Sequence, residues 1–359
     1  NNWFDSKHIV LNNIIKLNNI HGYVLPHAST KYTGHIISHT LQFKPTKSFK
    51  KIYIIYYPSQ KNPNIDNKYF HEYYVPFKSL EYVLQHYWKV TNVEIIGINV
   101  SFTHSLLKST IDLKKSLIVV SADFSHHLTM NKAIALENKA AHGLMFRDLN
   151  KPYMKVVDDV KSFDILYEII PNSWDLQWIG RSRSPGIKGV GYLSFIIKEN
   201  KINKIPNGIF ITAYDSQMNS RECLGEWFNH SKKYSKSIEN NLKHKVIKLG
   251  QENSRLTGGR NKHLSITHYS ITYLYKDKHY IKPIRGWHGI KYNSFYLPEV
   301  LLENTFNNGK WITVKDKEWI QNNNFNISET LSKLNEKSGL YNDSNKYELY
   351  YNNNVHFKL

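Results

Sequence analysis

A short polar segment follows an apolar run in the first half of the chain. The run Leu117–Ser121 is rich in β-branched and aliphatic residues, as in a strand buried on both faces. Asp123, His126 and His127 follow within six residues. Ligands of open α/β sheets bind beyond the carboxyl ends of the strands, and Asp and His serve as metal ligands or acid–base groups. The segment predicts a binding site. The alternative is a polar loop in which Asp123 caps the next helix.

A second apolar run ends in a similar way. Tyr23–Leu25 is followed by Pro26 and His27. Because parallel strands end at the same edge of a sheet, we expect His27, Asp123 and His126 to converge there. Two histidines and one carboxylate form a ligand set that suits non-haem iron. The alternative is a polar cleft in which both histidines are hydrogen-bonded to their neighbours.

Together these segments resemble the Memo family. Its members carry an apolar strand leading into P-H-A-G-Y-x-Y-[ST]-G and, later, S-[ST]-D-[FL]-[SC]-H. The matching pieces here, in the family's order, are Trp3-Phe4, Pro26–Ala28, Tyr32–Gly34, Lys51–Ser59, Glu72, Pro76-Phe77 and Ser121–His126. The resemblance implies a fold similar to the catalytic subunit of class III extradiol ring-cleaving dioxygenases, which use iron.

The same resemblance shows where the chain departs from the family's metal ligands. Memo proteins hold the metal with the His of P-H-A-G, a His of a P-S-H segment and a late Cys before Gly. His27 is kept, but Gln60 stands at the second position and Ile179 at the third. Gln is a weak neutral donor and Ile is no donor, so the resemblance implies no tightly bound iron. A replacement set of His27, Asp123 and His126 is the alternative.

A second resemblance, to the AMMECR family, covers about residues 221–351. Arg221–Gly225 matches the family's R-G-C-[IL]-G. Further pieces follow in the family's order: Asn253–Leu256, Leu264–Tyr275, Trp287–Ile290, Phe295–Val300 and Thr330–Leu340. The resemblance implies an α+β domain with a cleft lined by the R-G-C segment.

Cys223, in that segment, is the only cysteine of the chain. A nearby Arg221 would favour its thiolate, and His288 would act as base if the fold brings it close, which makes Cys223 and His288 the candidate catalytic pair. Glu222 replaces the family's Gly and places a negative charge beside the thiol. The alternative is that Cys223 is a small buried hydrophobe.

The spacing of apolar runs predicts an α/β fold. Expected strands lie at 22–26, 51–57, 93–99 and 116–121, and expected helices at 5–18, 34–43, 79–88, 103–112, 131–146 and 154–169. We predict a Memo-like domain over residues 1–217, with a mixed or parallel sheet sandwiched by helices and 207–214 as its last strand. A smaller α+β AMMECR-like domain is expected over 218–359.

Composition bounds the possible classes of protein. The 359 residues carry a net charge of +19, with basic residues scattered along the chain rather than gathered in one block. One cysteine allows no internal disulfide. There is no apolar run long enough to cross a membrane and no signal peptide in the first residues. We therefore expect an intracellular protein, without choosing among cytoplasm, organelle and virion.

These observations favour a non-catalytic or degenerate Memo–AMMECR fusion that acts as a binding or structural subunit of a larger assembly. Its partners would then be proteins, with a radical-SAM protein implied by family association alone. One alternative is a non-haem iron-dependent, oxygenase-type enzyme with a residual metal site. Another is a polyanion-binding protein whose basic surface meets an acidic partner or nucleic acid.

Overall fold

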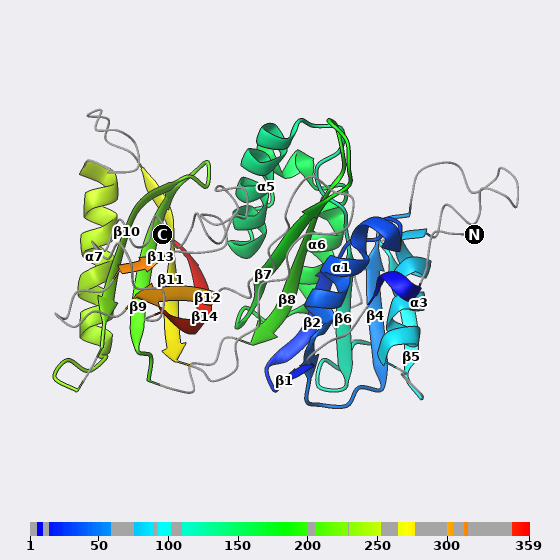
Figure 1. Cartoon of the computed structure of the whole chain (residues 1–359), viewed down its shortest axis with the longest axis horizontal. Helices are drawn as coiled ribbons and strands as arrows, with labels where there is room; N and C mark the ends of the chain where they lie inside the picture. The colour runs from blue at the N-terminus through cyan, green and yellow to red at the C-terminus, as the bar shows by residue number, and fades with distance from the viewer. Residues whose placement is uncertain are drawn as a thin grey trace, which may run out of the picture. The chain divides into compact units, whose positions relative to one another are not determined.

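The computed structural model shows a mixed α/β protein that divides into two compact units after Glu199 (Figure 1). The structure describes residues 6–9, 14–58, 75–88, 92–101, 110–199, 205–228, 230–252, 265–276, 300–304, 312–314 and 347–359. The division lies 18 residues before the predicted end of the first domain at residue 217.

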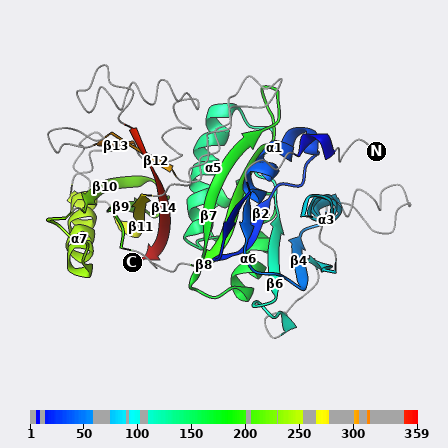
Figure 2. The ribbon, with the colours of Figure 1, turned by 60° about the horizontal axis from the view of Figure 1, so that its bottom comes forward.

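A six-stranded mixed sheet, in the order β5-β4-β6-β2-β8-β7, forms the centre of the first unit. Its strands are β2 (Ile20–Leu25), β4 (Lys51–Tyr56), β5 (Glu94–Asn99), β6 (Ser116–Ser121), β7 (Trp174–Arg183) and β8 (Gly191–Glu199). The first four run parallel, whereas β8 is antiparallel to both β2 and β7. Figure 2 shows this sheet with β2 near its middle. Every residue of β6 is buried, which agrees with its unbroken apolar run.

Helices cover both faces of this sheet. They are α1 (Thr30–Leu41), α3 (Val75–Trp88), α5 (Met130–Met145) and α6 (Val160–Ile169), with the 3-10 turns η1 (Ser6–His8) and η2 (Pro152–Val156). Two successive residues of β7 show the two layers. Ser182 contacts His35 of α1, with 2.6 Å between Oγ and Nε2, whereas Arg181 pairs with Glu137 of α5 at 3.0 Å. Because successive side chains of a strand point to opposite faces, α1 and α5 cover opposite sides of the sheet.

The helix predicted over residues 5–18 is wrong. In its place the structure has η1 and the short strand β1 (Ile15–Leu17), which pairs in parallel with β3 (Phe43–Pro45). The helical spacing of apolar residues there is overridden by this pairing with a distant segment, as happens when tertiary contacts outweigh local preference. Most of the helix predicted at 103–112 lies outside the described residues.

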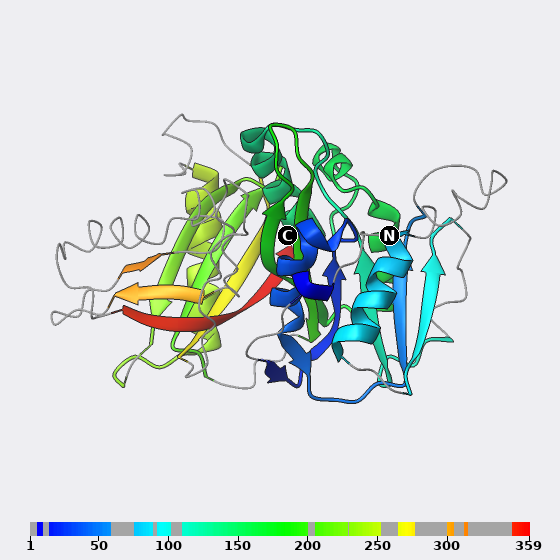
Figure 3. The same cartoon turned by 45° about the vertical axis from the view of Figure 1, so that its right-hand side comes forward.

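The second unit holds an antiparallel sheet in the order β10-β9-β11-β14-β12-β13 (Figure 3). Its elements are β9 (Gly208–Asp215), β10 (Ser220–Trp227), α7 (Lys236–Glu252), β11 (Ile266–Lys276), β12 (Val300–Asn304), β13 (Ile312–Val314) and β14 (Tyr347–Lys358). Helix α7 packs on one face, where Val246 joins Ile209, Ile211, Ala213 and Ile271 in a buried cluster. This face is the core of the second unit.

Assignment of residues 207–214 to the first domain is wrong. Strand β9 covers this segment and pairs with β10 on one side and β11 on the other, both in the second unit. Its alternating apolar pattern identified a strand but did not say which sheet it joins, because register with β11 is set by contacts about sixty residues away in sequence. Among the residues that the structure describes, no helix is long and apolar enough to span a membrane.

His35 gives the first unit a pH-dependent stability. Burial lowers its pKa from 6.5 to about 3, so the ring stays neutral in the folded protein while it gains a proton in the unfolded chain below pH 6.5. The unfolded state therefore binds more protons between these values, and stability falls as the pH falls through this window. With about 1.4 kcal/mol for each pKa unit, the loss between pH 6.5 and pH 5 is about 2 kcal/mol.

We expect the free energy of unfolding of the wild type, relative to that of His35→Gln, to fall by about 2 kcal/mol from pH 7 to pH 5. The wild type loses this stability because its histidine titrates, whereas the glutamine of the variant does not. Urea unfolding of both proteins at the two pH values measures it. The control is His86→Gln, at an exposed residue of α3, which keeps His35 and should therefore keep the loss of stability that the His35 ring causes between pH 7 and pH 5. A constant difference between wild type and His35→Gln would contradict this account.

Candidate metal centre

His27 and Asp123 lie side by side because the strands before them are neighbours in register. β2 and β6 pair in parallel, with Leu25 opposite Ser121. The backbone N–H of Ala122 donates to the carbonyl of Leu25 at 3.1 Å, which continues the pairing by one residue. His27 and Asp123 each follow their strand by two residues, so equal offsets bring them to the same edge of the sheet.

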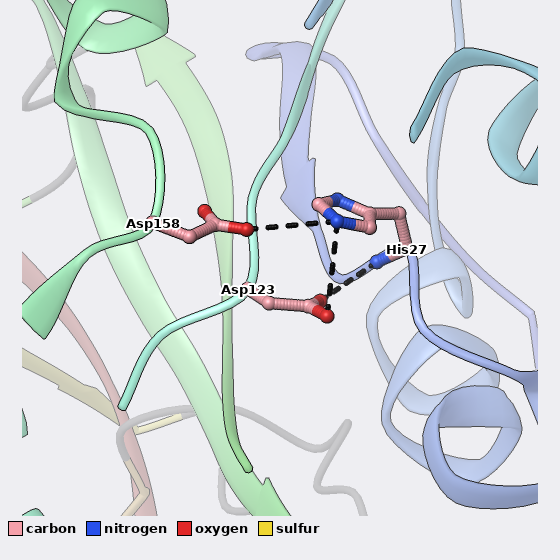
Figure 4. Close-up of side chains that lie close together, drawn as sticks. All are labelled: His27, Asp123 and Asp158. Atoms are coloured by element: carbon pink, nitrogen blue, oxygen red, sulfur yellow. Dashed lines mark hydrogen bonds and ion pairs between the residues drawn. The ribbon is translucent and has the colours of Figure 1, made fainter. Parts of the chain in front are cut away.

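Three side chains point toward one another at this edge: His27, Asp123 and Asp158 (Figure 4). The His27 Nε2 atom lies 3.8 Å from Oδ2 of Asp123 and 3.5 Å from Oδ2 of Asp158. The other carboxylate oxygen of Asp123 accepts a hydrogen bond from the backbone N–H of His27 at 2.9 Å. One donor atom of each residue lies within 4.8 Å of the other two.

Asp158 comes from the segment between η2 and α6. Its backbone N–H donates to the carbonyl of Asp123 at 3.2 Å, which holds the segment against the loop after β6. The next residue, Asp159, caps α6 by accepting a hydrogen bond from the N–H of Ser162 at 3.1 Å. Burial, then the charges of Asp123 and Asp159, raise the pKa of Asp158 well above its ordinary value.

Solvent reaches the cluster unevenly. The side chain of Asp123 is 6% exposed, that of His27 16% and that of Asp158 23%. Asp158 is therefore the side on which an ion or a small ligand would approach.

Hydrogen bonds to Gly191 and Glu137 also hold the loop that carries Asp123. The N–H of Phe124 donates to the carbonyl of Gly191 at 2.9 Å, and the N–H of Gly191 donates to the carbonyl of Ser125 at 2.7 Å. The Ser125 hydroxyl donates to the buried carboxylate of Glu137. A Cβ on Gly191 would lie 1.8 Å from Glu137 Oε1, so a larger residue here would displace the Glu137 carboxylate.

The structure brings together two of the three residues predicted as metal ligands. His27 and Asp123 belong to the cluster, whereas His126 is exposed and not part of it, with its ring against His127 at 6.2 Å between centroids. Ile179 lies in β7 and is fully buried, so it offers no donor. Gln60 lies outside the described residues.

Sequence reasoning missed Asp158. The helix predicted over 154–169 would have placed this residue inside a helix, but the structure has η2 and then α6, with Asp158 in the turn between them. The Asp158-Asp159 pair was the available signal, because Asp is a preferred residue at the start of a helix and Ser162 follows three residues after Asp159.

Hydrogen bonds within the second unit hold the described part of the Cys223 segment. The Thr212 hydroxyl donates to the Cys223 sulfur at 3.3 Å. Arg221 is engaged elsewhere: its Nε donates to Asp215 Oδ2 at 2.8 Å. Glu222 is paired with Ala213 and Cys223 with Thr212, so these neighbouring side chains point to opposite faces of the sheet. His288, the predicted base, lies outside the described residues.

No model of a known protein family matches this chain, and no curated protein sequence is detectably similar to it.

Asp215 organises the turn between β9 and β10. It accepts hydrogen bonds from the N–H groups of Gln217 at 2.8 Å and Asn219 at 3.0 Å as well as from Arg221. Burial alone would raise the pKa of Asp215, but the hydrogen bonds from Asn219, Arg221 and Gln217 outweigh it and lower the pKa.

We expect Asp215→Ala to lower the free energy of unfolding by about 2–4 kcal/mol, because it leaves Arg221 without its carboxylate and removes the turn's hydrogen bonds. Urea unfolding measures the loss. The matched control is Glu226→Ala, which removes a surface ion pair with Lys232 and should cost about 1 kcal/mol or less. Equal losses for the two variants would show that Asp215 has no special role.

Proposed function

We propose that the first unit binds a divalent metal ion through His27, Asp123 and Asp158. The observation that carries this proposal is that Nε2 of His27 faces one oxygen of each carboxylate, at 3.8 and 3.5 Å. Both separations exceed the usual range of an N–H···O hydrogen bond, about 2.7–3.2 Å. The separations therefore leave room for a small cation between the three side chains.

The spacing of the donor atoms supports this proposal. Ligand atoms about 2.0–2.2 Å from a shared ion, at angles of 90–110°, are about 2.8–3.6 Å apart. The separation of 3.5 Å between His27 and Asp158 falls in this range, and that of 3.8 Å between His27 and Asp123 is slightly longer.

The charges of the two carboxylates also support a bound metal ion. The carboxylates of Asp123 and Asp158 lie together, and this proximity contributes to the raised pKa of Asp158. A divalent cation would offset two negative charges and leave the cluster neutral. One imidazole with two carboxylates suits ions such as Mn²⁺, Fe²⁺ or Zn²⁺ better than ions that prefer sulfur ligands.

Such an ion would supply Lewis-acid chemistry or an activated water. The residues of the chain would hold it: His27 and Asp123 from the fixed edge of the sheet, and Asp158 from the exposed side. This set differs from that of the Memo family, in which the third ligand is a Cys at the position of Ile179. On the sequence resemblance alone, we propose that the first unit is Memo-like with a changed ligand set and that the second is AMMECR-like.

A second candidate function is a non-catalytic binding subunit of a larger assembly. It is supported by the complete burial of the aliphatic Ile179 where the resemblance places a metal-binding thiol. The two candidates differ in a simple way, since only the first requires a metal ion bound at His27.

We expect isothermal titration calorimetry with Mn²⁺ to show one site on the wild-type protein. His27→Gln and Asp158→Asn should each weaken binding about 100-fold or more, because each removes one of three ligands. Mn²⁺ at 100 times its dissociation constant should also stabilise the wild-type fold by about 2.7 kcal/mol.

Glu168→Gln is the matched control, since Glu168 is an exposed carboxylate on α6. It should bind Mn²⁺ as the wild type does. Absence of binding to the wild type would refute the metal site and leave the non-catalytic subunit as the surviving candidate. Equal affinity of wild type and Asp158→Asn would refute this ligand set.

A further inference from the structure

The Ser121 hydroxyl links the His27 ring to the backbone of α3. Ser121 is the last residue of β6 and is completely buried. Its Oγ lies 2.6 Å from the carbonyl oxygen of Pro76, in the first turn of α3, and 3.1 Å from Nδ1 of His27. The hydroxyl is thus placed between a carbonyl group and an imidazole nitrogen.

The single proton of this hydroxyl decides how the ring is protonated. A carbonyl oxygen can only accept, so the Ser121 hydroxyl donates its proton to Pro76. Toward His27 the same oxygen is then left with its lone pairs and acts as acceptor. Nδ1 of His27 must therefore carry a hydrogen, and in the neutral imidazole Nε2 carries the lone pair.

We propose that Ser121 is a positioning residue that fixes His27 in its Nδ1–H tautomer, so that the lone pair of Nε2 is directed toward Asp123 and Asp158. This inference rests on the proposed metal site, and it names the residue that prepares the imidazole for the ion. The opposite tautomer would place a hydrogen on the atom that must bind the metal. Metal-bound histidines commonly donate their other ring N–H to a fixed acceptor.

Ser121 is not a nucleophile activated by His27, although a serine, a histidine and an aspartate lie in a row. Its side chain is completely buried, and its proton is directed at the Pro76 carbonyl rather than at the imidazole. A substrate cannot reach this oxygen without displacing the core. The row therefore orients the ring and performs no acyl transfer.

A second serine in the same region holds His27 without touching its ring. The hydroxyl of Ser79, in α3, donates to the backbone carbonyl of His27 at 3.1 Å. Ser79 is buried, with 2% of its surface exposed. Ser79→Ala is therefore a matched control. It removes a hydrogen bond to the same segment but keeps the contact between Ser121 and the His27 ring.

The direct test is nitrogen-15 NMR of the metal-free, full-length protein, at a pH where imidazole rings are neutral. Two-bond nitrogen–proton correlations distinguish the protonated from the unprotonated ring nitrogen. We expect Nδ1–H for His27 in the wild type and in Ser79→Ala, and a shift toward Nε2–H in Ser121→Ala. Nε2–H in the wild type would overturn the proposal, and this result needs no variant to fold.

Mn²⁺ affinity provides the second readout. Ser121→Ala should weaken binding about 10–100-fold, as is typical of losing a partner behind a metal-bound histidine. Ser121→Thr, which keeps the hydroxyl, should recover most of the loss, and Ser79→Ala should change affinity by less than about threefold. An unchanged tautomer and affinity in Ser121→Ala would overturn the proposal. Nδ1–H in a wild type that binds no Mn²⁺ would instead refute the metal site itself.

Discussion

The close parallel pairing of β2 and β6 is the constraint on which the candidate metal centre depends. Gly22 of β2 lies opposite Ile118 of β6, and a Cβ on Gly22 would lie 1.9 Å from the Ile118 carbonyl oxygen. Only glycine permits this approach. The register that follows sets Leu25 beside Ser121, and with it the loops that carry His27 and Asp123. Two residues almost a hundred positions apart in sequence thus share one edge, where the backbone N–H of His27 also donates to the Asp123 carboxylate at 2.9 Å.

Further hydrogen bonds position the rest of the site. Backbone hydrogen bonds join the Asp123 loop to Asp158 and to the start of β8. The buried Ser121 hydroxyl then contacts the histidine ring. The cluster that results brings two carboxylates to one imidazole in a partly shielded place. In that arrangement, burial and then the charges of Asp123 and Asp159 raise the pKa of Asp158. A bound cation would offset the repulsion between these carboxylates.

Sequence patterns predicted the parallel core well and its surroundings poorly. The expected strand at 116–121 agrees with β6, because an unbroken apolar run between polar residues has one good location, the centre of a sheet. Asp158 was missed because the apolar spacing from 154 onward continues across the break that the Asp159 cap imposes. The β7–β8 hairpin was missed as well, and β9 was placed in the wrong unit. Such pairings depend on partners far away in the sequence, which local periodicity does not identify.

Crystals of the full-length protein soaked with Mn²⁺ would test the central claim most directly. Anomalous diffraction near the manganese absorption edge locates the ion without reference to any assumed ligand. The account predicts one strong peak about 2.0–2.3 Å from Nε2 of His27 and from one oxygen each of Asp123 and Asp158. A well-ordered site with no peak there, or with a peak bound by other residues, would contradict it.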